Sequence, residues 1–171
     1  MSATIRFDSL GPDDFAAVAE LAGEIWHRHF IGMISREQIA YMLAGRYTPE
    51  KLGRYLGAPD RWFRLLRVDG GLCGYCSYAL SPRPGEMKLE QLYLSEDRRG
   101  QGLGGRMMDE VEAAARAGGC DTLMLTVNRH NVGAIDVYLR RGFAVREEVA
   151  ADIGNGFVMD DYVMEKRLDL A

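Results

Sequence analysis

The sequence predicts an α/β protein, with a mixed β-sheet and helices on both faces of the sheet. Apolar residues recur at helical spacing up to about residue 56, strand patterns dominate after it, and one strand–helix–strand unit lies between 87 and 127. Such a crossover makes its two strands parallel, whereas hairpins join antiparallel strands. We therefore expect a mostly antiparallel sheet with one parallel pair, formed by residues 87–94 and 122–127.

The N-terminal part of the chain is predicted to hold one strand and three helices. Residues 4–7 have a strand pattern, and Gly11-Pro12-Asp13-Asp14 opens a helix, because proline suits the first helical position and acids suit the positive end of the helix dipole. Ser35 and Gln38 form a capping-box pattern that begins a second helix. Thr48-Pro49 begins a short third helix that ends near residue 56.

The remaining elements are mostly strands separated by recognisable turns. Asp69-Gly70-Gly71 indicates a hairpin, because Asp-Gly accepts the left-handed backbone of a tight turn. Gly142 ends the last helix, and Gly154-Asn155-Gly156 joins the two closing strands. The predicted strands are 62–68, 72–80, 87–94, 122–127, 143–149 and 157–166, and the predicted helices are 102–117 and 131–140.

Composition and charge narrow the class of protein. The chain has 171 residues, is 47% hydrophobic and 27% charged, and shows no repeat or linker, so we expect a single domain over 1–171 with its core in about 4–168. The net charge of −4 argues against a nucleic-acid partner. Neither a secretory signal nor a membrane-spanning stretch is recognisable, so we expect a cytoplasmic protein without a membrane partner.

Three cysteines are present, and two of them have the spacing of a metal or redox motif. Cys73 and Cys76 are separated by two residues within a predicted strand. Residues three apart on a strand lie about 10 Å apart on opposite faces, which is too far for a disulfide. No second cysteine pair or histidine pair completes a zinc site. We expect buried free thiols and no metal.

The most informative motif is the glycine-rich run from Arg98 to Gly105, which leads into a predicted helix. The first N–H groups of a helix have no intrahelical acceptor, and the helix dipole is positive there, so such a turn binds anions. Glycines at 100, 102 and 104 leave the backbone bare for a phosphate.

Two well-known phosphate loops fit this run poorly. Gly100, Gly102 and Gly105 match the dinucleotide pattern GxGxxG, but residues 95–99 separate them from the preceding strand, and Asp121 stands before the next strand instead of closing it. A Walker A loop would need a Gly-Lys-Ser/Thr sequence that does not follow. A purely structural glycine turn with solvated arginines is the remaining alternative.

The pattern Arg99-x-x-Gly102-x-Gly104 resembles the acyl-CoA pyrophosphate loop of the GNAT superfamily of N-acetyltransferases, whose motif reads Gln/Arg-x-x-Gly-x-Gly/Ala. Asn131-x-x-Ala134-Ile135-x-x-Tyr138-x-x-x-Gly142-Phe143 resembles the family's second cofactor segment. The resemblance implies the GNAT acyl-CoA N-acyltransferase fold, with acetyl-CoA as co-substrate and no metal. The residues that it implies at the cofactor are Leu92, Tyr93, Leu94, Arg99, Gly100, Gln101, Gly102, Leu103, Gly104, Gly105 and Asn131.

The two ends of the chain resemble a narrower bacterial branch of the family, which includes polyamine-acetylating enzymes. The matching segments are residues 25–30, 37–43 and 152–162. We expect the first helices to form the acceptor wall, because aromatic faces attract ammonium ions. The candidates are Trp26, His27, His29, Phe30 and Tyr41, each of which has an ordinary core or surface role as its alternative.

Acetyl transfer to an amine needs a proton acceptor, a stabilised oxyanion and a protonated leaving thiolate. The resemblance implies that the backbone at 92–94 faces the oxyanion and the pantetheine arm. This requires the strands 87–94 and 122–127 to diverge, and a β-bulge near 90–93 would create that gap. Tyr138 is the predicted proton donor to the thiolate, with a core tyrosine as the alternative. Glu90 is the predicted general base, acting directly or through water, because alternation places it among leucines, where burial would raise its pKa. An exposed strand residue is the alternative for Glu90.

These residues predict an enzyme that transfers acetyl from acetyl-CoA to a primary amine of a small molecule, such as a polyamine, by direct attack on the thioester. Two other functions stay open: a protein or peptide N-acetyltransferase, and a non-catalytic acyl-CoA-binding module. The oligomeric state is also open, and an exposed C-terminal edge strand would allow a homodimer.

Overall fold

The computed structural model describes residues 2–169, and its contacts fall into two compact units. The first unit holds the chain up to Ala79 together with Gln91–Glu110, and the second holds Leu80–Glu90 together with the chain from Val111. The strand order is β1-β2-β3-β4-β5-β7-β6, and β4 contributes residues to both units. The predicted mixed sheet is confirmed, while a single domain over 1–171 stays a prediction.

In the first unit, β1 (Ile5–Ser9), β2 (Arg61–Val68) and β3 (Gly71–Leu80) pair in antiparallel order. The turn between β2 and β3 places Asp69 at φ 51° and Gly70 at φ 85°. Both values lie in the left-handed region that a two-residue hairpin turn requires, so the predicted Asp-Gly turn is confirmed.

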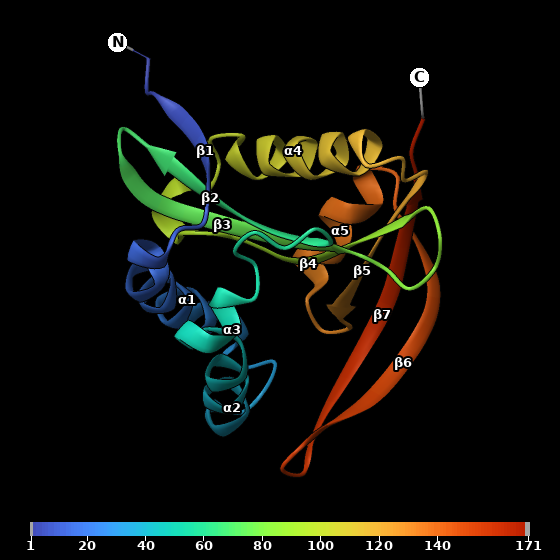
Figure 1. The fold of residues 1–171 in the computed structure, drawn as a ribbon. Coiled ribbons are helices and arrows are strands. Elements are labelled where there is room, and N and C mark those ends of the chain that lie inside the picture. Colours follow the sequence, from blue (N-terminus) through green and yellow to red (C-terminus); the bar gives the residue numbers. More distant parts are fainter. Residues whose placement is uncertain (1, 170–171) are drawn as a thin grey trace. The chain divides into compact units, whose positions relative to one another are not determined.

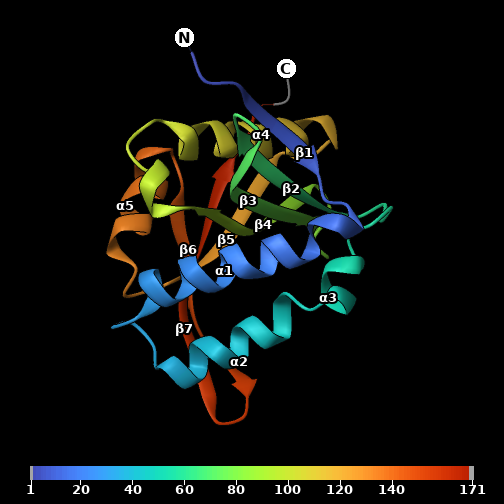
Figure 2. The ribbon, with the colours of Figure 1, turned by 90° about the vertical axis from the view of Figure 1, so that its left-hand side faces the viewer.

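Of the helices of the first unit, the second and third begin at the caps that the sequence predicts, whereas the first begins only at Phe15, because the predicted opening at Pro12–Asp14 forms a 3₁₀ turn. The third helix ends at Gly53 and not near residue 56. The helices are α1 (Phe15–Phe30), α2 (Arg36–Arg46) and α3 (Pro49–Gly53). Ser35 Oγ accepts the N–H of Gln38 at 3.0 Å, and Thr48 Oγ1 accepts that of Lys51 at 3.3 Å. In Figures 1 and 2, α1 and α3 lie on one side of β2 and β3, and the start of α4 lies on the other. None of the helices in residues 2–169 is both long and apolar enough to cross a membrane.

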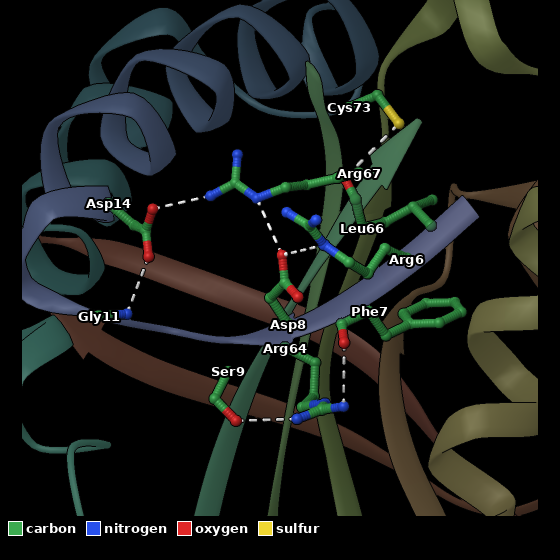
Figure 3. A network of polar contacts seen from close by, with 10 residues as sticks. All are labelled: Arg6, Phe7, Asp8, Ser9, Gly11, Asp14, Arg64, Leu66, Arg67 and Cys73. Carbon is green, nitrogen blue, oxygen red and sulfur yellow. Dashed lines mark hydrogen bonds and ion pairs between the residues drawn. The ribbon is translucent and has the colours of Figure 1, made fainter. Parts of the chain in front are cut away.

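A network of charged side chains fixes the start of α1 against β1 and β2 (Figure 3). Asp8 accepts hydrogen bonds from Arg6 at 3.0 Å and from Arg67 at 3.1 Å. Arg67 also donates to Asp14 at 2.8 Å, and the other oxygen of Asp14 accepts the N–H of Gly11 at 2.9 Å. The acidic residue predicted to open the first helix therefore also ties that helix to the sheet.

A buried polar network holds the part of β4 that belongs to the first unit. The hydroxyls of Tyr47 and Tyr75 are 2.8 Å apart, Tyr47 donates to the side-chain oxygen of Gln91, and Gln91 donates to Ser77 at 3.1 Å. Because the one hydroxyl hydrogen of Tyr47 goes to Gln91, Tyr75 is the donor to Tyr47. Burial raises the pKa of both phenols, so the network stays neutral. A buried hydrogen-bond network of this kind specifies one position for Gln91.

The second unit consists of the first part of β4 and the elements that follow the middle of α4. The parallel pairing of β4 with β5 runs from Glu86 opposite Thr122 to Leu89 opposite Leu125, which confirms the predicted parallel pair. β7 pairs with β5 on one side and with β6 on the other, both in antiparallel order. Two elements belong to both units, β4 (Glu86–Leu94) and α4 (Leu103–Ala117). The elements wholly in the second unit are β5 (Thr122–Asn128), α5 (Val132–Arg140), β6 (Ala144–Gly154) and β7 (Phe157–Arg167).

The three cysteines are free and buried, as the sequence predicts. Cys73 and Cys76 lie on β3, and the thiol of Cys73 contacts the carbonyl oxygen of Leu66 at 3.6 Å (Figure 3). Burial raises the pKa of each thiol, and that of Cys76 reaches about 12. Within residues 2–169, no group of three or more His, Cys, Asp and Glu side chains is arranged to hold a metal ion.

Candidate active site

The predicted phosphate loop lies in the first unit, between a 3₁₀ turn at Glu96–Arg98 and the first residue of α4. Gly100 and Gly102 have φ values of 80° and 76°, a conformation that side chains rarely adopt. A Cβ on either glycine, or on Gly104, would meet nothing within 4 Å. These glycines therefore serve the shape of the turn and leave open space above the backbone.

The first turn of α4 offers backbone donors beside this open space. The N–H of Arg106 donates to the carbonyl oxygen of Gly102 at 3.2 Å, which is the first hydrogen bond of the helix. The amides of residues 103–105 precede it and, as in any α-helix, have no intrahelical acceptor. Leu103 is buried and anchors the turn, whereas Gln101 is exposed. The arrangement has the features of an anion site.

A cleft of about 450 Å³ lies between α1 and the segment that leads into the loop. Arg28 of α1 pairs with Glu96 at 3.0 Å, and both side chains are largely exposed. The cleft is lined by Leu21, Glu24, Ile25, Arg28, His29, Leu94, Ser95, Glu96, Asp97 and Arg99. It therefore brings together two residues predicted at the cofactor, Leu94 and Arg99, with one predicted at the acceptor, His29.

The last two residues of β4 lie near α1. The ring of Tyr93 lies 5.5 Å from that of Trp26 on α1, while the next residue, Leu94, lines the cleft together with α1 residues. Neighbouring residues on a regular strand face opposite sides. The ladder of β4 with β5 ends at Leu89 opposite Leu125, before the bulge expected near 90–93, which stays a prediction. Leu92, Tyr93 and Leu94 are all half-buried.

Gly74 on β3 sets how closely the two strands approach at this point. A Cβ on Gly74 would lie 2.9 Å from the carbonyl oxygen of Tyr93, and the N–H of Ser95 donates to the carbonyl of Cys73 at 2.8 Å. Any side chain at position 74 must therefore push the backbone of β4 away. The glycine is needed for contact with the backbone that is predicted to face the thioester.

We expect Gly74→Ala to destabilise the protein by about 1–3 kcal/mol, because the added methyl group would clash with the backbone of β4, which must then shift. Denaturant unfolding measures this change. Gly71→Ala is the matched control on the same strand, since its Cβ would meet the nearest atom at an ordinary 3.5 Å. Equal stability of the two variants would contradict the close approach.

The residues predicted for the acceptor wall divide into two groups. Trp26 and Phe30 are buried and their rings are 4.8 Å apart, and His29 contacts Phe30 at 4.8 Å. His27 is exposed, with Nδ1 2.8 Å from the carbonyl oxygen of Gly23 in its own helix. The exposed Tyr41 lies on α2. The structure thus brings Trp26, His29 and Phe30 together and does not add His27 to them.

Sequence reasoning missed other aromatic neighbours of Trp26. Tyr47 lies 6.2 Å from Trp26, ring to ring, and Tyr93 was considered only as a cofactor residue. Arg46 lies over the Trp26 ring at 5.1 Å, so this indole face already attracts a cation. The one signal in the sequence was the spacing of four residues from Ala22 to Trp26 and from Trp26 to Phe30, which continues the buried stripe of the helix.

In the second unit, Asn131 caps α5. It is buried, and its side-chain oxygen accepts the N–H of Ala134 at 3.4 Å. The capping role considered from the sequence is therefore confirmed. Contact of the same side chain with the cofactor stays a prediction.

Tyr138 lies on α5 with its ring 5.6 Å from that of Phe143. Burial raises the pKa of Tyr138 to about 12. The group is therefore a neutral phenol at physiological pH and carries the proton that a donor needs.

Glu90 is half-buried and is the last β4 residue in the second unit. The following residue, Gln91, begins the part of β4 in the first unit, where the Tyr47 network holds it. The division of β4 between the two units therefore falls directly after Glu90, the residue predicted to be the general base. The role of Glu90 as that base stays a prediction.

A comparison with protein-family models matches residues 16–143 to the acetyltransferase (GNAT) family. The chain belongs to the GNAT acetyltransferase family. The matched segment includes the phosphate loop, Asn131 and Tyr138. The resemblance noted from the sequence is thereby confirmed, and the protein is an N-acetyltransferase of this family.

Several relatives of this GNAT protein resemble it over most of the chain. Spermidine N(1)-acetyltransferase of Thermoplasma acidophilum is 26% identical over 170 residues, which cover 97% of this chain and 99% of that protein. An uncharacterized N-acetyltransferase in the pepI 3′ region of Lactobacillus delbrueckii subsp. lactis is 27% identical over 140 residues, covering 78% and 80%. Among solved structures, PaiA N-acetyltransferase from T. acidophilum, in complex with coenzyme A, superposes with a TM-score of 0.81 at 24% identity, covering 96% and 99%.

Proposed function

We propose that this GNAT protein transfers the acetyl group of acetyl-CoA to a primary amine of a small molecule, with polyamines as the leading class. The observation that carries the proposal is the open, left-handed glycine turn at the start of α4. It supplies backbone donors for a pyrophosphate without side chains in the way. The spermidine-acetylating relative, which matches nearly the whole chain, supports the choice of acceptor.

Each part of the donor has its own proposed residues. The pyrophosphate binds the amides of residues 100–105, and Arg99, exposed at the rim of the cleft, neutralises part of its charge. The pantetheine arm follows the backbone of residues 92–94 and reaches the side chain of Asn131.

The reaction is direct attack of the amine on the thioester carbonyl. Glu90 takes the amine's proton, directly or through water, because a primary ammonium with a pKa near 10.4 cannot attack. Backbone N–H groups at 92–94 stabilise the oxyanion. The carbon–sulfur bond then breaks, and the CoA thiolate takes the hydroxyl proton of Tyr138, whose pKa of about 12 keeps it protonated until that step.

The acceptor wall is proposed to consist of Trp26, Phe30 and Tyr93, with His29 at its edge. The rings of Trp26 and Phe30 each contact that of Tyr93, and the proposal rests on the attraction of aromatic faces for ammonium ions, of which Arg46 over the Trp26 ring is an example within the protein. The acids Glu24 and Asp97 line the neighbouring cleft and add attraction for a polyamine.

A thiol-release screen tests the function. Acetyl-CoA is mixed with the protein and with simple amines, diamines, spermidine, spermine, peptides with free N-termini and lysine peptides. We expect saturable, amine-dependent CoA release with polyamines and little with peptides. Faster release with peptides would favour the protein N-acetyltransferase alternative, and acetyl-CoA binding without transfer to any amine would indicate a non-catalytic module. A homodimer and a cytoplasmic location stay predictions from the sequence.

A further inference from the structure

A buried carboxylate in the second unit joins three separate elements. Glu112 lies in the second half of α4, and its side chain is 5% exposed. One of its oxygens accepts a hydrogen bond from Arg141 at 2.7 Å, and the other accepts one from Lys166 of β7 at 2.7 Å. Arg116, one turn further along α4, approaches at 3.8 Å. The carboxylate thus connects α4, the end of α5 and β7.

A buried carboxylate lowers the stability of the folded protein unless positively charged groups and hydrogen bonds compensate for its lost hydration. Burial by itself would raise the pKa of Glu112, but the hydrogen bonds from Lys166 and Arg141 hold that pKa below its usual value. Glu112 is therefore ionised at neutral pH. Removing one partner of a buried pair leaves an uncompensated charge, so the three side chains act together.

Arg141 links this cluster to the backbone of Tyr138. Arg141 is the residue directly after α5, and its N–H is shared between the carbonyl oxygens of Val137 and Tyr138, each at 3.1 Å. The N–H of Phe143 donates to the carbonyl oxygen of Tyr138 at 3.0 Å, and its ring packs on the phenol ring. Between them, Gly142 adopts a φ of 97° that closes the turn. The carbonyl of Tyr138 is therefore held by a turn whose first residue is bound to Glu112.

We propose that Glu112 is a positioning residue for acyl transfer, which holds the end of α5 through Arg141 and thereby orients the phenol of Tyr138. This inference rests on the proposed function, in which Tyr138 protonates the leaving thiolate. A small displacement of a catalytic group lowers the reaction rate strongly, since a misplacement of about 1 Å can lower it about 100-fold. The ion pair would thus affect the chemical step without touching the substrate.

The first test is Glu112→Gln, which keeps the shape of the side chain and removes its charge. We expect kcat to fall about 10-fold, with KM for acetyl-CoA and for the amine changed less than about two-fold, because binding groups are not moved. Glu86→Gln is the matched control: Glu86 is also buried in the second unit, 3% exposed, and pairs with Arg146 at 2.9 Å. We expect comparable destabilisation in that control, with kcat within about two-fold of wild type.

A double-mutant cycle separates positioning from general stability. In a Tyr138→Phe background there is no hydroxyl to orient, so we expect Glu112→Gln to leave kcat unchanged there while still lowering stability. An equal loss of kcat in both backgrounds would overturn the inference alone. A near-normal kcat of Tyr138→Phe itself would overturn the proton-donor role, and with it this inference.

Arg141→Lys provides a second test of the proposal if the Glu112→Gln variant does not fold. It keeps the positive charge near Glu112 but loses the planar fork of the guanidinium. We expect a loss of kcat that disappears in the Tyr138→Phe background. A loss that persists in that background would contradict the proposal.

Discussion

Replacement of Tyr138 by phenylalanine is expected to lower kcat about 100-fold, with KM for acetyl-CoA within about two-fold of wild type. The change removes only the hydroxyl that would protonate the CoA thiolate, and it keeps the ring that packs on Phe143. Steady-state thiol release at saturating amine measures the effect. Because the pKa of Tyr138 is raised to about 12, its ionisation should not lower the rate below that pH, and an alkaline limb at lower pH would report other groups.

Tyr78→Phe is the matched control for this prediction. Tyr78 is buried on β3, burial raises its pKa to about 12 as well, and its ring stacks on Trp62 at 5.6 Å. We expect this variant to keep wild-type kcat. Near-normal turnover of Tyr138→Phe would remove Tyr138 from its role, and an equal loss in the two variants would point to the loss of a buried hydroxyl in general.

The substitution Gly102→Glu is expected to abolish acetyl-CoA binding. The new side chain would occupy the open space above the loop and place a negative charge at the positive end of α4, where the pyrophosphate is proposed to bind. Isothermal titration calorimetry with acetyl-CoA measures the affinity directly, without requiring an acceptor amine.

Gly119→Glu is the control that separates charge at the site from backbone strain. Gly119 has a φ of 78°, against 76° for Gly102, and a Cβ there also meets nothing within 4 Å. Both variants thus carry the same strain and the same charge, and only Gly102→Glu should lose binding. Retained micromolar affinity in Gly102→Glu would refute the placement of the pyrophosphate.

Features that depend on a few neighbouring residues could be predicted from the sequence. The hairpin at Asp69-Gly70 and the caps at Ser35, Thr48 and Asn131 follow from local backbone chemistry, which no distant contact needs to supply. The glycine turn is equally local, since its left-handed residues can be read directly. The glycine turn and the segment that begins at Asn131 were the local patterns that indicated the family.

Features that depend on contacts between distant residues could not be predicted. The first closing strand was expected to end at residue 149, but β6 continues to Gly154 because its ladder partner β7 continues with it. The network from Tyr47 to Gln91 joins residues that are 44 positions apart in the sequence, so no local sequence pattern predicts it. Glu112 is similar, because a glutamate on a helix is ordinarily solvated, and only the fold brings Arg141 and Lys166 to it.

The burial of the cysteines bears on the chemical selectivity of a protein that handles a thioester. Acetyl groups pass readily from one thiolate to another, so an accessible low-pKa cysteine would compete with the amine for the acyl donor. Here all three sulfurs are buried and stay protonated. The cysteine thiols are thereby kept from attacking the thioester, and they do not compete with the acceptor amine for the acetyl group.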